Sequence, residues 1–226
     1  MRLNLKRFTA LLIVTLSLTA CQRVNEQEET QPEATTEEQI KARALQDEFT
    51  RSMLKSAQET EKGYYTLESK TGVYEMLFPT GGEIDGIGYT RKGESSEAFL
   101  AGILYNDKTE AQLSVRYTTV LSNDETGIGY AKELLTNSIG EDMKFEQIDG
   151  KGKVTYVAPF KKKETGSYGY GAYIHPDEGW GGVEIIYTGS CMDDPKSCGP
   201  EEEEFKKRAY KLISSVKFLN KNEAKK

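Results

Sequence analysis

The stretch QLSVRYTTVLSNDETGIGYAKELLTNSIG, residues 112–140, contains the two patterns on which the fold prediction depends. Its first ten residues are rich in branched and aromatic side chains, which is typical of a β-strand. Residues 125–140 are predicted to form a helix, because apolar side chains recur at helical spacing. These side chains are Ile128, Ala131, Leu134, Leu135 and Ile139. The stretch therefore predicts a strand followed by a helix with one apolar side.

Short strands are predicted on both sides of this stretch. Runs of aromatic and branched residues separated by Gly, Asp and Asn indicate strands: YYTLES (64–69), VYEMLF (73–78) and AFLAGILY (98–105). Residues 143–159 predict a hairpin with its turn at Asp149-Gly150. Residues 167–189 predict a second hairpin with its loop around 176–179.

The closing segment PEEEEFKKRAYKLISSVKFL, residues 200–219, predicts a helix. Pro200 suits the first helical turn, and a stripe of apolar side chains is expected to face the core. The stripe consists of Phe205, Ala209, Leu212, Ile213 and Val216. The acids 201–204 complement the helix dipole in the first turn, which we prefer to a metal-binding interpretation.

The predicted order is helix, four strands, helix, four strands and helix, over roughly 180 residues, enough for one domain with its own core. Antiparallel hairpins with separate helices indicate an α+β fold, a mainly antiparallel sheet covered by helices.

This arrangement resembles the PsbP family, accessory subunits of the photosynthetic oxygen-evolving complex. The resemblance lies in the early run VYEMLFPTGGEI, the central helix after SVRYTTVL and a closing helix that ends in ISSVKFL. It covers about residues 64–219 and contains no diagnostic motif. The resemblance implies a PsbP-like sandwich and a protein-binding or assembly role without catalysis.

The N-terminus, MRLNLKRFTALLIVTLSLTAC, has the features of an export signal: three cations, then a short apolar segment. Leu18-Thr19-Ala20-Cys21 resembles the bacterial lipobox. The resemblance implies cleavage before Cys21, which then carries diacylglycerol and anchors the protein to the membrane. An ordinary signal peptide that happens to end in Cys is the alternative.

The predicted boundaries follow from these segments. Residues 1–20 are the signal peptide, and 21–35 are the lipidated Cys and a Glu-, Gln- and Thr-rich tether that cannot bury enough apolar surface to fold. Residues 36–62 are predicted to form a helix that packs on the domain, because a capping box at Thr36 precedes an apolar stripe. Residues 63–220 form the α+β domain, and 221–226 a disordered tail.

The charge of the chain argues against nucleic acid as a partner. The formal net charge is −6, and removal of residues 1–20, which hold three cations and no acid, changes it to −9. An acidic domain lacks the basic surface that nucleic acids require.

The loop CMDDPKSC, Cys191 to Cys198, holds the two cysteines other than Cys21. In an exported domain, oxidising conditions favour a disulfide between them. A zinc site needs more Cys or His ligands than this chain offers, since it has one His. Calcium bound by Asp193 and Asp194 is the alternative that the loop leaves open.

No catalytic motif is recognisable, so we predict that the chain is not an enzyme, needs no cofactor and has no catalytic or metal-binding residue. His175 is the single His, and we expect it to be an exposed loop residue. The sequence has no GxSxG motif for a nucleophile elbow. Gly127-Ile128-Gly129 precedes a helix, but Lys132 stands where a dinucleotide-binding fingerprint needs Gly.

The run YGYGAYIHPDEGW, residues 168–180, is the candidate ligand-binding surface. Alternation along a strand puts Tyr168 and Tyr170 on one face, and Tyr173 and His175 on the other. With Trp180, these aromatic side chains form a candidate site for stacking on sugar rings. The alternative is that Gly and Tyr simply shape a curved strand.

We therefore predict a lipid-anchored extracytoplasmic protein with a non-catalytic binding or accessory role at the cell envelope, and an unidentified envelope protein as partner. The first alternative is a small-ligand or glycan-binding lipoprotein, and the second is a cell-wall hydrolase or another envelope enzyme. Because Gln22 is not a retention Asp, the outer membrane is the expected location if the cell has two membranes.

Overall fold

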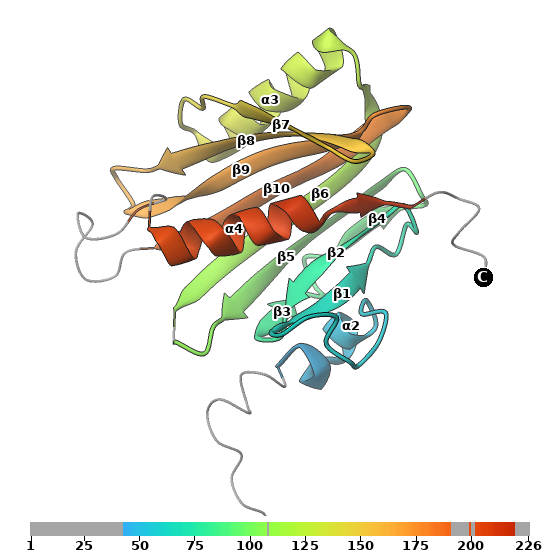
Figure 1. The fold of residues 1–226 in the computed structure, drawn as a ribbon, viewed down its shortest axis with the longest axis vertical. Coiled ribbons are helices and arrows are strands. Elements are labelled where there is room, and N and C mark those ends of the chain that lie inside the picture. The colour runs from blue at the N-terminus through green and yellow to red at the C-terminus, as the bar shows by residue number, and fades with distance from the viewer. Residues whose placement is uncertain (1–42, 108, 191–198, 200–201, 220–226) are drawn as a thin grey trace, which may run out of the picture. The chain divides into compact units, whose positions relative to one another are not determined.

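The described strands pair into two sheets, and every pair among them is antiparallel (Figure 1). The computed structural model describes residues 43–107, 109–190, 199 and 202–219. In chain order the elements are α2 (Glu48–Arg51), β1 (Tyr64–Glu68), β2 (Tyr74–Pro79), β3 (Gly82–Ile84), β4 (Thr90–Lys92), β5 (Ser96–Leu104), β6 (Glu110–Ser122), α3 (Glu125–Ile139), β7 (Glu146–Gly150), β8 (Lys153–Lys161), β9 (Ser167–Pro176), β10 (Trp180–Ser190), α4 (Glu203–Ser215) and β11 (Lys217–Phe218).

The larger sheet has eight strands in the order β3-β5-β6-β10-β9-β8-β7, with β4 also paired to β5. The smaller sheet has the order β1-β2-β11. The α+β class and the mainly antiparallel pairing predicted from the sequence are therefore confirmed.

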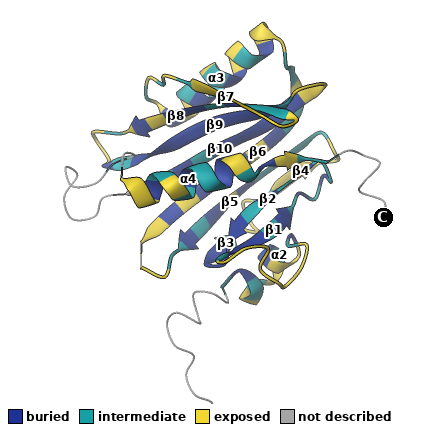
Figure 2. Ribbon diagram, in the orientation of Figure 1, coloured by how far each residue is buried: buried dark blue, intermediate teal, exposed yellow. Residues whose placement is uncertain are grey.

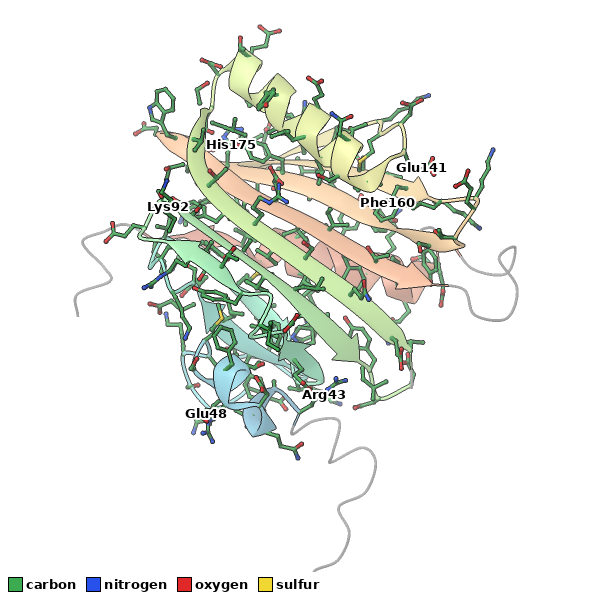
Figure 3. The ribbon with its side chains drawn as sticks, turned by 180° about the vertical axis from the view of Figure 1, so that it is seen from behind. Arg43, Glu48, Lys92, Glu141, Phe160 and His175 are labelled. Carbon is green, nitrogen blue, oxygen red and sulfur yellow. The ribbon has the colours of Figure 1, made fainter. Side chains whose placement is uncertain are left out.

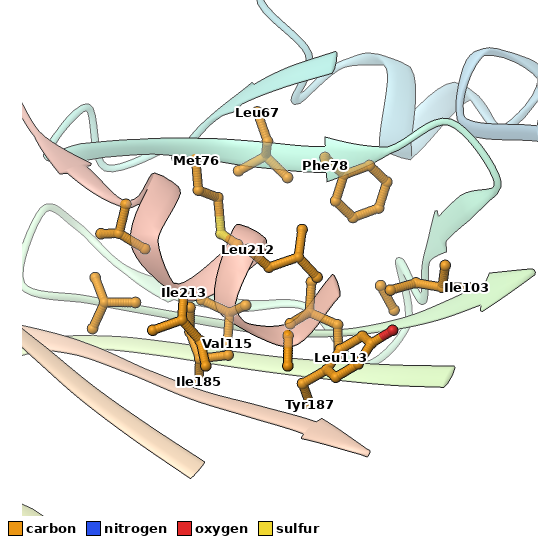
Figure 4. Packing of buried hydrophobic residues seen from close by; sticks show 14 of the residues in the cluster. Leu67, Met76, Phe78, Ile103, Leu113, Val115, Ile185, Tyr187, Leu212 and Ile213 are labelled. Carbon is orange, nitrogen blue, oxygen red and sulfur yellow. The ribbon is translucent and has the colours of Figure 1, made fainter. Parts of the chain in front are cut away.

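The main core lies between the two sheets, and α4 contributes to it. Buried residues of the larger sheet, the smaller sheet and α4 form one cluster (Figure 4). In that figure Leu212 and Ile213 of α4 lie between Met76 of the smaller sheet and Ile185 of the larger sheet. We call the side of the larger sheet that faces this cluster the core face, and the opposite side the back face.

The helix α3 lies on the back face, over β8, β9 and β10 (Figure 3). Leu135 and Ile139 of α3 pack with Phe160 of β8 in a second, smaller cluster. A Cβ atom on Gly171 of β9 would lie 2.7 Å from Ile139 Cδ1, so this glycine gives α3 room to approach the sheet closely. Strands β9 and β10 are consequently buried on both faces (Figure 2).

The ends of α3 follow from local sequence signals. Asp124 caps the N-terminus, where its side chain accepts a hydrogen bond of 2.8 Å from the backbone N–H of Gly127. Gly140 ends the helix in the left-handed conformation, at φ 77°. The helix predicted at 125–140 is thus confirmed, and Ala131, Leu135 and Ile139 are buried as predicted.

The helix predicted at 36–62 is wrong beyond Arg51. Residues 43–46 are helical, Asp47 interrupts the helix with an extended backbone, and α2 ends at Arg51. The chain then runs beside β1, where the backbone N–H of Lys55 donates to Thr66 at 2.9 Å. Residues 53–55 therefore form backbone hydrogen bonds with β1 instead of the hydrogen bonds of a longer helix. Its predicted packing on the domain is confirmed, because Ala44 and Met53 belong to the main core.

Three further details differ from the predictions. The first hairpin turns at Lys151-Gly152, two residues later than predicted, because Gly152 supplies the positive φ. The closing helix ends at Ser215, and residues 217–218 pair with β2 instead of continuing it. The short strands β3 and β4 were not predicted, since three residues carry too little pattern to recognise.

Several predictions concern residues outside those that the structure describes. These are the signal peptide and tether (1–35), the capping box at Thr36 and the tail (221–226). Within the described ranges, no helix is both long enough and apolar enough to cross a membrane. The PsbP-like character of the sandwich stays a prediction.

Candidate functional site

The predicted aromatic binding surface is largely buried. Tyr168 and Tyr170 lie on one face of β9, as predicted, but that face is the core face. The ring of Phe205 in α4 lies 4.6 Å from that of Tyr168, centroid to centroid. Tyr173 and His175 share the back face, also as predicted, with ring centroids 5.8 Å apart. All four are buried, because β9 lies inside the sheet and helices pack near both of its faces, so their predicted stacking on sugar rings is wrong.

Trp180 is the exception in this group, since 67% of its surface is exposed. Trp180 is the first residue of β10, and it pairs with Ser122, the last residue of β6. A single exposed ring does not form the multi-ring surface that the sequence predicted.

His175 is a buried strand residue, so its predicted place in an exposed loop is wrong. Its ring stacks on Tyr156 at 6.0 Å, and its Nδ1 lies 2.8 Å from the carbonyl oxygen of Pro176. Its Nε2 is buried without a hydrogen-bond partner in the described structure.

Cys21, Cys191 and Cys198 lie outside the described residues, and so do Asp193 and Asp194. The lipidation, the disulfide and the calcium alternative therefore stay predictions. Among the residues that are described, no group of three or more His, Cys, Asp or Glu side chains could hold a metal ion.

Two of the surface depressions formed by the described residues are considered as candidate sites. The first, which we call the α4 cleft, has a volume of about 600 Å³ and lies beside the first turns of α4. Its wall includes Tyr64, Tyr105, Asp107, Lys207 and Arg208. Both cations and carboxylates line this cleft.

Arg208, in the wall of the α4 cleft, already makes contacts within the protein. Its guanidinium donates to Asp107 Oδ2 at 2.6 Å and to Thr109 Oγ1 at 2.6 Å, and it lies 3.9 Å above the ring of Tyr105. It also pairs with Glu204 at 3.3 Å. Arg208 thus joins α4 to the loop between β5 and β6, which is a structural role.

The electrostatics of this cluster agree with that role. Burial alone raises the pKa of Asp107, but the hydrogen bonds from Arg208 and Thr109 outweigh it and lower the pKa to about 2. Burial lowers the pKa of Arg208, and the hydrogen bond to Asp107 reverses this, so the net shift is upward. Both groups are therefore held in their charged forms by one another.

The second depression, which we call the α3 groove, lies on the back face where none of the described helices covers β5 and β6 (Figure 3). Its volume is about 350 Å³, which is within the range of small-molecule sites. α3 forms one wall through Tyr130 and Leu134, and Val120 of β6 adds to the apolar lining. Val120 is 77% exposed and Tyr130 52%, so large apolar side chains meet solvent around this groove.

A carboxylate lies in the floor of the α3 groove. Glu184 of β10 stands directly opposite Arg116 of β6, and Arg116 in turn stands opposite Ala98 of β5. The side chain of Glu184 is 7% exposed, and its Oε2 lies 3.5 Å from Arg116 Nη1. Burial raises the pKa of Glu184, and the nearby Arg116 offsets part of that rise. A buried carboxylate thus faces a mainly apolar groove.

Glu184, Arg116 and Tyr130 were not among the residues singled out from the sequence. Glu184 did carry a signal, because a lone acid stands between Val183 and Ile185 in an otherwise apolar strand. Arg116 carried none, since a charged residue at an outward position of an alternating strand is ordinary.

Comparisons with known proteins place the chain in a family. Residues 40–217 match the protein family described as "Putative lipoprotein YvcA". The protein of that name from Bacillus subtilis (strain 168) is 32% identical over 187 residues, which cover 78% of this chain and 76% of the relative. A crystal structure at 1.50 Å of a protein from Bacteroides thetaiotaomicron VPI-5482 has a TM-score of 0.37 and 13% identity. That alignment covers 72% of this chain and 50% of the other, and at this level it supports no argument.

The fold and the family define an α+β protein of the lipoprotein class. The chain belongs to the family described as "Putative lipoprotein YvcA". Family membership supports the lipoprotein prediction made from the N-terminus, and with it a location at a membrane and outside the cytoplasm.

Proposed function

We propose that the chain is a lipoprotein anchored through diacylglycerol on Cys21, and that its domain acts outside the cytoplasm by binding, without catalysis. The α3 groove is the observation on which the binding role depends. A depression whose exposed surface is mainly apolar, with a buried carboxylate in its floor and further polar side chains in its lining, has the composition of a ligand site.

The location proposed is the cell membrane, or the outer membrane if the cell has two. The resemblance to the PsbP family agrees with an accessory role, but it does not name a ligand. Four of the five residues of the glycan-binding alternative are buried, which argues against that alternative.

The anchor is tested by metabolic labelling of cells with a fatty-acid analogue. The full-length chain is expected in the membrane fraction with the label attached, and the Cys21→Ser variant is expected without label. Cys191→Ser is the matched control and should keep the label. Label that persists in Cys21→Ser would show that Cys21 is not the lipidation site.

The binding role is tested with a photo-crosslinking amino acid at position 130, in the wall of the α3 groove. Position 133, also in α3 but exposed and outside the groove lining, is the control. The mass of the irradiated protein reports both small ligands and protein partners. We expect a discrete adduct at 130 that is missing at 133. Equal adducts at both positions, or none at either, would remove the support for binding in this groove.

A further inference from the structure

Glu184 is the most unusual group in the α3 groove, because a carboxylate that is 93% buried needs a compensating charge or proton. Among the described residues, Arg116 is the one cation that pairs with it. The strands on either side hold Glu184 in place, since β10 pairs with both β6 and β9. The backbone position of Glu184 in the floor is therefore fixed by the sheet.

The pairing with Arg116 is loose. The separation of 3.5 Å exceeds the roughly 2.7–2.9 Å of a good charge-assisted hydrogen bond. The Arg116 side chain is 55% exposed, so it can turn into solvent and be hydrated there. A ligand cation that reaches Glu184 can thus replace Arg116 without leaving a buried charge unpaired.

The remaining polar groups of the groove also suit a cation. Three hydroxyl residues, Ser96, Thr118 and Thr90, line it together with a second carboxylate residue, Glu97. Hydroxyl and carboxylate oxygens can both accept from an ammonium group. The ring of Tyr130 forms part of the wall, and an aromatic face attracts cations. The negative net charge, −6 for the whole chain and −9 without residues 1–20, adds a weak long-range attraction.

We propose that the α3 groove binds a small organic amine with an apolar body, whose ammonium group replaces Arg116 as the partner of Glu184. The apolar body then lies against Val120, Leu134 and the ring of Tyr130. This inference depends on the proposed binding function of the same groove, and it adds the chemical class of the ligand.

The test compares three probes with the same six-carbon chain: hexylammonium, hexanol and hexanoate. Binding to the full-length protein in lipid nanodiscs is measured by titration calorimetry at neutral pH, with empty nanodiscs as the blank. Hexylammonium is expected to bind at least about tenfold more tightly than hexanol, which corresponds to one buried charge-assisted contact. Hexanoate is expected to bind most weakly of the three, since Glu184 repels it.

Two substitutions separate the roles of the paired charges. Glu184→Gln keeps the shape of the side chain and should abolish the preference for hexylammonium over hexanol. Arg116→Gln removes the competing cation and should strengthen hexylammonium binding. Glu83→Gln is the matched control, because Glu83 pairs with Arg43 at 2.8 Å outside the groove and should not affect binding. If circular dichroism shows that Glu184→Gln does not fold, the effect of Arg116→Gln on hexylammonium binding still tests the inference.

The possible outcomes are distinct. Tighter binding of hexanoate that Arg116→Gln abolishes would overturn the inference and make Arg116 the recognition group. Equal binding of hexylammonium and hexanol would also overturn it, but would leave a binding groove and the proposed function intact. If none of the probes binds at millimolar concentration, the inference fails, and the crosslinking at position 130 decides separately whether the groove binds anything else.

Discussion

The Phe205→Ala substitution is expected to weaken the attachment of α4 to the larger sheet. Phe205 is buried against three tyrosine rings, with ring centroids 4.6 Å from Tyr168, 4.9 Å from Tyr187 and 6.4 Å from Tyr170. Replacing a buried Phe by Ala costs about 3–5 kcal/mol, because apolar contacts are lost and a cavity remains. Domains of this kind are stable by only about 5–15 kcal/mol, so the loss would be a large part of the total.

Urea unfolding followed by circular dichroism measures this loss. The transition midpoint should fall while the slope of the free energy against urea stays the same. Phe205→Leu retains much of the apolar volume and should cost less. Ile87→Ala, at a side chain that is 99% exposed, should change stability by no more than about 0.5 kcal/mol. A loss below about 1 kcal/mol in Phe205→Ala would refute the conclusion that α4 is an integral layer of the core.

Three further predictions concern charge, backbone and the cysteines. The pKa of Asp107 is about 2 in the fold against roughly 3.9 in an unfolded chain, so its stabilising effect is complete above about pH 4 and is lost as the pH falls toward 2. Because the Asp107 side chain is 48% exposed, that effect should stay below about 1 kcal/mol in acid titrations, and Asp107→Asn should remove it. Gly181→Ala should lower the free energy of unfolding in urea by at least about 2 kcal/mol, since φ is 81° and the new Cβ would lie 2.2 Å from a backbone oxygen of β6. Gly179→Ala, with φ 102° and open space around the new Cβ, should lower it by less. Alkylation and mass spectrometry should modify Cys191 and Cys198 only after reduction if they form the predicted disulfide.

The sequence predicted best those helices and strands whose capping residues and apolar stripe lie within the element or next to it. The α3 helix is an example, since its cap, its apolar stripe and its terminal glycine all lie within residues 124–140. The end of the helix at Arg51 could not be predicted with the same ease, because it depends on β1 offering backbone partners to residues 53–55. The strand β11 likewise exists through its pairing with β2, which is far away in the sequence.

The candidate site was harder to predict than the fold. Alternation along β9 correctly assigned Tyr168 and Tyr170 to one face and Tyr173 and His175 to the other. It could not reveal that α4 and α3 cover these faces, because both helices come from other parts of the chain. The α3 groove, with Glu184 in its floor, lies beside α3 on the part of the sheet that this helix leaves uncovered. Its position therefore depends on where α3 packs.

The sequence by itself determined the predicted export signal, the class of fold and the type of most elements, because these depend on composition and short-range periodicity. Tertiary structure alone decided which aromatic residues are buried and which carboxylate faces a groove. The physical reason is that burial is a property of two surfaces in contact, and in this protein the second surface comes from a distant segment.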